Sequence, residues 1–117
     1  MVQYRTRGDA VNLVAAAIAD PTRRAILDRL ARGPARISDV AQPFSMSLTG
    51  FCKHVRVLER AKLVRRKRRG RENMLALSPE PLRAVAGWIS FYQQFWTERV
   101  DRLERFFADE NEKEKLR

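Results

Sequence analysis

The stretch that decides the fold is Ser47–Ala61, which reads SLTGFCKHVRVLERA. Ser47 is a favourable N-cap residue, and Phe51, Val55 and Leu58 follow at the i, i+4, i+7 spacing of a buried helical stripe. The opposite face is small at its start and basic further on, and it holds Thr49, Lys53, Arg56 and Arg60, with Gly50 and His54 at its edges. A helix with such a face can approach a nucleic-acid groove closely, so the pattern predicts a recognition helix.

A shorter helix is expected directly before it. Residues 38–42 predict one helical turn with Ser38 as N-cap and with Val40 and Ala41 facing inward, and Pro43 ends it. Residues 44–46 leave room for a tight connection, so the two helices together predict a helix-turn-helix.

Two longer helices are expected further upstream. The first covers Asp9–Ala19, with Asp9 as N-cap. The second begins at Pro21 with Asp20 as N-cap, because the residue before a proline avoids helical backbone angles, and it stops near Arg32 at a Gly-Pro pair. The residues expected to be buried are Val11, Val14, Ala15 and Ile18 in the first helix and Ile26, Leu27 and Leu30 in the second.

A basic hairpin is expected after the recognition helix. Apolar pairs at Leu63-Val64 and at Met74–Leu77 flank a strongly basic tip that contains Gly70. A run of five basic residues could also be disordered. Its position directly after a helix-turn-helix favours the wing of a winged helix.

The positive charge is concentrated in this part of the chain. The formal charge of the 117 residues is +10, and the segment Lys53–Arg71 has ten Lys or Arg side chains against one acid. Such a concentration is typical of a nucleic-acid surface. The alternative is a solvated basic loop that aids solubility or touches an anionic membrane.

The last helix is expected to run from Pro79 to about Asn111, with a charged tail at 112–117. Its apolar residues recur every three or four positions, and additional aromatic residues widen that stripe beyond what one small domain can cover. Part of the stripe belongs to the core. The excess favours a dimer over a monomer.

Several of these stretches resemble one known family. Asp20–Leu27, Met46–Glu59, Leu63-Val64 and the wing tip Gly70-Arg71-Glu72 are similar to the ArsR/SmtB-type repressors, as is a last helix with two tryptophans. The resemblance implies a homodimeric winged helix-turn-helix repressor whose first and last helices form the interface. In many relatives a metal or another signal releases DNA from the dimer.

The resemblance also implies roles for individual residues. The groove-facing positions are Ser47, Thr49, Gly50, Lys53 and His54, to which the exposed face adds Arg56. The wing positions are Arg68, Arg69 and Arg71, with Arg66 from the same basic run. The expected dimer interface consists of Val14, Ile18, Trp88, Ile89, Tyr92, Phe95, Trp96, Val100 and Leu103.

Two positions depart from the family pattern. Lys62 stands where relatives usually have glycine, at the left-handed end of the recognition helix, which predicts mild backbone strain. Cys52 replaces a common serine or glutamine. Its thiol could sense oxidants because basic neighbours favour the thiolate, but a lone helical cysteine is more often an apolar filler.

Other function classes find little support. The expected third and last helices lack the cysteines and histidines of the family's metal sites, so we expect no metal and no cofactor. The sequence has one histidine, no Gly-rich phosphate loop and no convincing set of nucleophile, base and acid. We therefore expect no enzyme and name no catalytic residue. No apolar run is long enough to span a bilayer and the N-terminus has no signal segment, so we expect a cytoplasmic protein without membrane contact.

The sequence therefore predicts one domain over residues 1–117, mainly helical, with five helices plus a β-hairpin wing. Residues 9–78 are expected to bind duplex DNA and residues 79–111 to dimerise. The expected function is repression by a homodimer on an inverted-repeat promoter operator, with no inducer identified. An RNA-binding or protein-docking module is the alternative, although the basic segment has no aromatic residue after Phe51 on which bases could stack.

Overall fold

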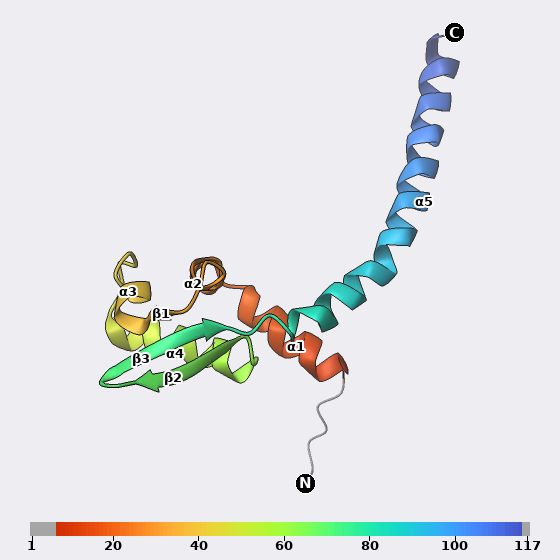
Figure 1. Cartoon of the computed structure of the whole chain (residues 1–117). Helices are drawn as coiled ribbons and strands as arrows, with labels where there is room; N and C mark the ends of the chain where they lie inside the picture. The colour runs from red at the N-terminus through yellow and green to blue at the C-terminus, as the bar shows by residue number, and fades with distance from the viewer. Residues whose placement is uncertain (1–6, 116–117) are drawn as a thin grey trace. The chain divides into compact units, whose positions relative to one another are not determined.

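The computed structural model describes residues 7–115, and the expectations for the N-terminal segment and for the last two tail residues lie outside them. Five helices and three strands follow one another along these residues (Figure 1), namely α1 (Arg7–Ile18), α2 (Pro21–Leu30), β1 (Ala35–Arg36), α3 (Ile37–Ala41), α4 (Leu48–Arg60), β2 (Val64–Arg69), β3 (Glu72–Leu77) and α5 (Leu82–Lys115). The chain divides into two units, one up to Val85 and one from Ala86 onward. The winged helix-turn-helix and its five helices are confirmed.

The wing belongs to a three-stranded antiparallel sheet with the order β1-β3-β2. The hairpin β2–β3 was predicted, whereas β1 was not. β1 pairs Ala35 with Leu75 and Arg36 with Met74. A strand of two residues has no periodicity that a sequence pattern could reveal.

Helix α4 forms as predicted from its cap and its stripe. The Ser47 hydroxyl accepts a hydrogen bond from the Gly50 backbone N–H at 3.1 Å, which satisfies one of the free donors of the first turn. Phe51, Val55 and Leu58 are all buried. The opposite face is thereby turned to solvent.

The end of α4 forms a Schellman motif with a lysine at the left-handed position. Lys62 has φ 64°, its N–H donates to the Glu59 carbonyl, and the Leu63 N–H donates to the Leu58 carbonyl, both at 3.0 Å. Leu58 and Leu63 are both fully buried, as the hydrophobic contact of this motif requires. The predicted left-handed position is confirmed.

The expected start and stop signals of α1, α2 and α3 are correct in part. Asp20 is the N-cap of α2, and its carboxylate accepts the Arg23 N–H at 3.0 Å. The caps at Asp9 and Ser38 are wrong: α1 begins at Arg7, and α3 begins at Ile37 after an extended Arg36. α2 ends at Leu30, two residues before the predicted stop.

One core lies between α1–α4 and the inner face of the sheet. Val14 is buried in α1 as predicted, but its buried neighbour is Ala17, whereas Ala15 is exposed. Val11 and Ile18 are half-buried, so the stripe of α1 differs from the predicted one in burying Ala17 in place of Ala15. The core consists of Val14, Ala17, Ile26, Leu30, Ala35, Val40, Phe51, Val55, Leu58, Ala61, Leu63, Val64 and Leu75.

Helix α5 begins and ends later than predicted. Pro79 and Pro81 fall in the turn before it, where the Leu82 N–H donates to the Pro79 carbonyl at 2.9 Å and the Arg83 N–H to the Glu80 carbonyl at 3.0 Å, and the helix starts at Leu82. It continues to Lys115, beyond the predicted end at Asn111. Two lysines lie in its last turn, where their positive charges interact favourably with the negative end of the helix dipole. None of the described helices is long and apolar enough to cross a membrane.

Candidate nucleic-acid interface

The outer face of α4 exposes most of the side chains that the sequence assigned to a groove. Thr49, Lys53 and Arg56 are exposed, as is the capping residue Ser47. They come from successive turns of one helix, and the only acid of α4, Glu59, lies near its far end. The first half of this face is therefore narrow and free of negative charge.

Gly50 keeps the start of this face small. A Cβ atom built at Gly50 would lie 3.3 Å from the Ser47 hydroxyl oxygen, the atom that caps the helix. A larger residue would crowd the cap and thicken the surface next to Thr49. The glycine therefore favours both the cap and a close approach.

His54 differs from its neighbours because it is turned toward the rest of the domain. Its side chain is 24% exposed, its Nδ1 atom lies 3.1 Å from the Arg23 guanidinium, and the same atom lies 3.8 Å from the Asp20 carboxylate. The Arg23 backbone N–H, which donates to the Asp20 carboxylate, lowers the pKa of Asp20 below its ordinary value, and the charge of the Arg23 guanidinium acts in the same direction. His54 is thus a half-buried hydrogen-bonding residue at the junction of α1 and α2.

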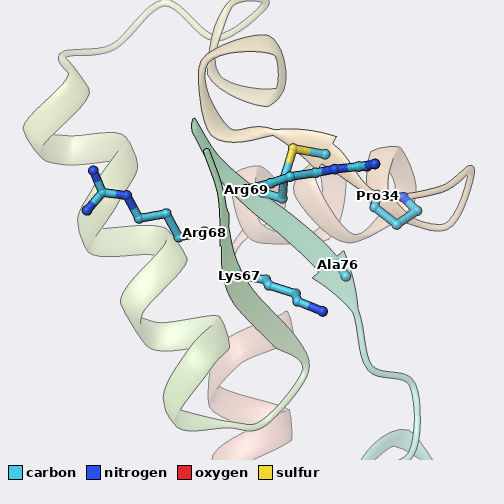
Figure 2. Close-up of a pocket in the computed structure, with 6 residues that line it drawn as sticks. Pro34, Lys67, Arg68, Arg69 and Ala76 are labelled. Atoms are coloured by element: carbon cyan, nitrogen blue, oxygen red, sulfur yellow. The ribbon is translucent and has the colours of Figure 1, made fainter. Parts of the chain in front are cut away.

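The basic side chains of β2 point alternately to two faces of the sheet. Arg66 lies opposite the buried Leu75, and Arg68 lies opposite Asn73, so both share the inner face that packs on α4. Lys67 and Arg69 share the outer face with their partners on β3. Figure 2 shows the Arg68 side chain leaving the strand on the opposite side from Lys67 and Arg69.

A shallow apolar hollow of about 440 Å³ lies on the outer face (Figure 2). Pro34, Met74 and Ala76 contribute its apolar lining, and the basic residues 67–69 border it. Lys67 and Arg69 extend on this side of the sheet and are exposed. The outer face is therefore amphipathic.

The tip of the wing is a two-residue turn. Gly70 has φ 64° directly after the last residue of β2, at the position where type II′ hairpin turns take glycine. Arg71 is exposed at the tip, and the Arg68 Nε atom donates to the Gly70 carbonyl at 3.2 Å. Two arginines are thus held at the end of the hairpin.

Both acids that border this surface are engaged by arginines. The Arg66 guanidinium lies 3.0 Å from the Glu59 carboxylate, and Arg36 lies 3.0 Å from Glu72. The Glu72 carboxylate also raises the pKa of Arg36 above its ordinary value. The charged side chains without an ion-pair partner between Lys53 and the wing tip are consequently basic, whereas Arg66 is paired with Glu59.

The residues expected at a dimer interface fall into two groups. In the second unit, Trp88, Tyr92 and Phe95 are exposed, Trp88 stacks edge-on against Tyr92 at 5.0 Å, and the Arg99 guanidinium lies 5.6 Å from the Phe95 ring. Ile89, Trp96, Val100 and Leu103 are exposed as well. In the first unit Ile18 is half-buried against the core.

Val14 is the exception among them. It has no exposed surface in its own protomer, so its side chain cannot contribute to an interface in this conformation. The sequence pattern could not separate the two uses, because a core residue and an interface residue of α1 are equally apolar.

The described residues contain no group of three or more histidines, cysteines or acids that could hold a metal ion. Cys52 is a free thiol at a half-buried position on α4. Arg23, which holds His54, was missed in the sequence. The two residues are 31 positions apart, and only their places in the fold bring them together.

The comparisons with known proteins find transcriptional regulators with a helix-turn-helix domain. A model of a helix-turn-helix domain matches residues 18–67. The HTH-type transcriptional regulator Rv2034 of Mycobacterium tuberculosis is 36% identical over 81 residues, which cover 69% of this chain and 73% of that protein. The transcriptional repressor SdpR of Bacillus subtilis is 33% identical over 79 residues, which cover 68% of this chain and 88% of that protein.

The solved structures agree with these relatives. The crystal structure of an ArsR family transcriptional regulator is 42% identical, with a TM-score of 0.72 over 83% of this chain and 97% of that one. A homodimeric winged helix-turn-helix domain from Mycobacterium bovis, solved by NMR, shares the fold at 23% identity, with a TM-score of 0.59 over 83% of this chain and 95% of that one. The chain has a helix-turn-helix followed by a basic wing, and its relatives are transcriptional regulators. It therefore belongs to the ArsR family of DNA-binding transcriptional regulators.

Proposed function

We propose that the protein is a repressor that binds an inverted-repeat operator as a homodimer, and that it acts in the cytoplasm by blocking access to a promoter. The observation that carries this proposal is the set of exposed basic side chains on the outer face of α4 and on the wing, next to which Glu59 and Glu72 are paired with arginines. SdpR is named a transcriptional repressor, which favours repression over activation.

Within this surface we assign two different roles. Thr49 and Lys53 lie on the exposed face of α4, which is narrow enough for a major groove because of Gly50. Arg68, Arg69 and Arg71 lie at or near the tip of the wing, where the phosphate backbone or the minor groove is within reach. Contacts to base edges would select the sequence, and contacts to phosphates would supply affinity.

Dimerisation is proposed from the surface of α5. None of its residues is buried in the protomer, and ten large apolar side chains between Trp88 and Phe107 are exposed. A patch of this extent on one helix is unusual in a soluble monomer. The homodimeric fold neighbour supports a second copy of the chain as the occupant. Two protomers related by a two-fold axis would present two recognition helices to successive major grooves.

The alternative role is RNA binding or docking of a partner without promoter control. Duplex DNA is favoured because the side chains of the wing are basic and not aromatic, and single-stranded RNA is read mainly by stacking on aromatic rings.

The experiment selects bound fragments from genomic DNA with the purified protein and then compares three ligands, the selected duplex, a random duplex and a single-stranded RNA. We expect selection of an inverted repeat and a steep fall in duplex affinity with salt. Selection of no common sequence, with equal affinity for RNA, would replace the repressor by the alternative.

A further inference from the structure

The Arg23 guanidinium contacts both the end of α1 and the His54 imidazole. Its Nε atom donates to the Ala17 carbonyl at 2.6 Å, and one terminal nitrogen donates to the Ala16 carbonyl at 3.0 Å. Both acceptors lie near the C-terminal end of α1, where helix carbonyls lack partners within the helix. The second terminal nitrogen lies 3.1 Å from His54 Nδ1. The guanidinium therefore connects the end of α1 to the middle of the recognition helix.

The chemistry of arginine determines which atom of the pair carries the proton. A guanidinium has five N–H donors and no acceptor, and it does not lose its proton in proteins. The hydrogen between Arg23 and His54 must come from Arg23, so His54 Nδ1 accepts and carries no proton. The neutral imidazole then has its proton on Nε2.

The Nε2–H group is left available to an external acceptor. Among the described residues no side-chain hydrogen bond engages Nε2, and the His54 side chain is 24% exposed. Its helix neighbour Lys53 lies on the exposed face of α4. A phosphate oxygen is an acceptor, so a single N–H donor beside a lysine matches the DNA backbone.

We propose that Arg23 is a positioning residue for DNA binding. It fixes the tautomer and the orientation of His54, so that the Nε2–H group donates to a DNA phosphate. This inference rests on the proposed function of α4. The competing explanation is that Arg23 stabilises the end of α1 and has no effect on DNA.

Arg24 provides a matched control for that explanation. Its guanidinium donates to the Ile18 carbonyl at 2.7 Å, so it also caps the end of α1, yet it has no contact with His54. Replacing either arginine by alanine removes one positive charge and one capping side chain from α2. The two variants differ in the hydrogen bond to His54 and in the number of bonds to α1 carbonyls, which is two for Arg23 and one for Arg24.

The first test is a double-mutant cycle on duplex DNA, with Arg23→Ala, His54→Ala, the double variant and Arg24→Ala. We expect Arg23→Ala to weaken DNA binding roughly three- to thirtyfold more than Arg24→Ala does, and to have almost no further effect in the His54→Ala background. Equal losses from Arg23→Ala in both backgrounds would overturn the proposal in favour of the stabilising role. If Arg23→Ala unfolds, Arg23→Lys keeps the charge but cannot reach both α1 and the imidazole, and the same non-additivity is expected.

The second test uses the fact that the chain contains one histidine. In protein labelled with ¹⁵N-histidine and purified without a histidine tag, the two imidazole nitrogens give one unambiguous pair of NMR signals. At pH 8 we expect the Nε2–H tautomer in the wild type and in Arg24→Ala, and a mixture of tautomers in Arg23→Lys. A proton on Nδ1 in the wild type would overturn the assignment. If the wild type did not bind duplex DNA, the proposed function and the phosphate contact would both fail, while the NMR signals would still show whether Arg23 sets the tautomer.

Discussion

Arg66 on β2 and Glu59 in the last turn of α4 form an ion pair at 3.0 Å that joins the wing to the recognition helix. Each side chain is about one-third exposed, so the pair lies at the border of the basic surface. It connects β2 to the last turn of α4, and it also withholds one arginine from DNA. An exposed pair of this kind contributes at most about 1 kcal/mol to stability.

Glu59→Gln should therefore strengthen DNA binding in general. Release of Arg66 toward a phosphate should raise affinity for random duplex DNA and increase the salt dependence by up to about one counterion. Fluorescence anisotropy over a range of salt concentrations measures both. The control is Glu80→Gln, which removes the same charge from an exposed pair with Arg83. Equal effects of both variants would assign the gain to net charge and not to Arg66.

The exposed stripe of α5 should hold the dimer together. Trp96→Glu places a charge in this stripe and is expected to yield monomers and to weaken operator binding. Gln94→Glu adds the same charge about 160° away around the helix and should leave the dimer intact. Light scattering at micromolar concentration decides between the two states. A wild-type protein that is monomeric at this concentration and still binds its operator tightly would contradict the proposed assembly.

Lys62 is expected to cost stability. Its left-handed backbone is unfavourable for any residue with a Cβ atom, so Lys62→Gly should stabilise the domain by roughly 0.5–1 kcal/mol after the greater flexibility of an unfolded glycine is counted. Lys62→Ala removes the same charge and keeps the Cβ atom, and it should bring no such gain. Urea unfolding of the three proteins measures the difference. A gain as large for alanine as for glycine would show that charge, and not backbone strain, is responsible.

Asp20 should make the free energy of unfolding of the domain fall at low pH. The Arg23 N–H, which donates to the carboxylate, lowers the pKa of Asp20 in the folded protein below its ordinary value of 3.8. The contribution is therefore complete above that value and is lost as the pH falls through the lower folded pKa. Asp20→Asn keeps a capping side chain and should flatten the decline of the urea midpoint below about pH 4. An equally steep decline in both proteins would assign the acid sensitivity to other groups.

The sequence predicted best those features that depend on local spacing. The cap and the buried stripe of α4 were predicted from Ser47, Phe51, Val55 and Leu58, and the wing turn from Gly70. Helix caps and hairpin turns are determined by residues only a few positions apart in the sequence. The error at Ala15 has the same origin. Residues 15–17 are three consecutive alanines in a weakly amphipathic helix, so the pattern cannot tell them apart, and only packing decides that Ala17 is buried.

Contacts between distant elements could not be predicted. Arg23 and His54 belong to different motifs, and nothing in either motif indicates that their side chains meet. Glu59 and Arg66 are separated by a turn whose geometry depends on the left-handed Lys62. The burial of Val14 likewise follows from the arrangement of several elements around α1. Each of these relationships requires the folded chain, and each changes the expected role of a residue.

We propose that α4 reads the sequence of duplex DNA while the wing binds its backbone. The most direct measurement is a salt titration of Lys53→Ala and Arg69→Ala on the selected operator and on a random duplex. We predict that Lys53→Ala costs about 1–3 kcal/mol on the operator and narrows its advantage over random DNA. Arg69→Ala should weaken both duplexes nearly equally and lower the salt slope by about one. A selective loss of operator preference in Arg69→Ala with a uniform loss in Lys53→Ala would reverse the two roles, and unchanged binding in both variants would contradict the account.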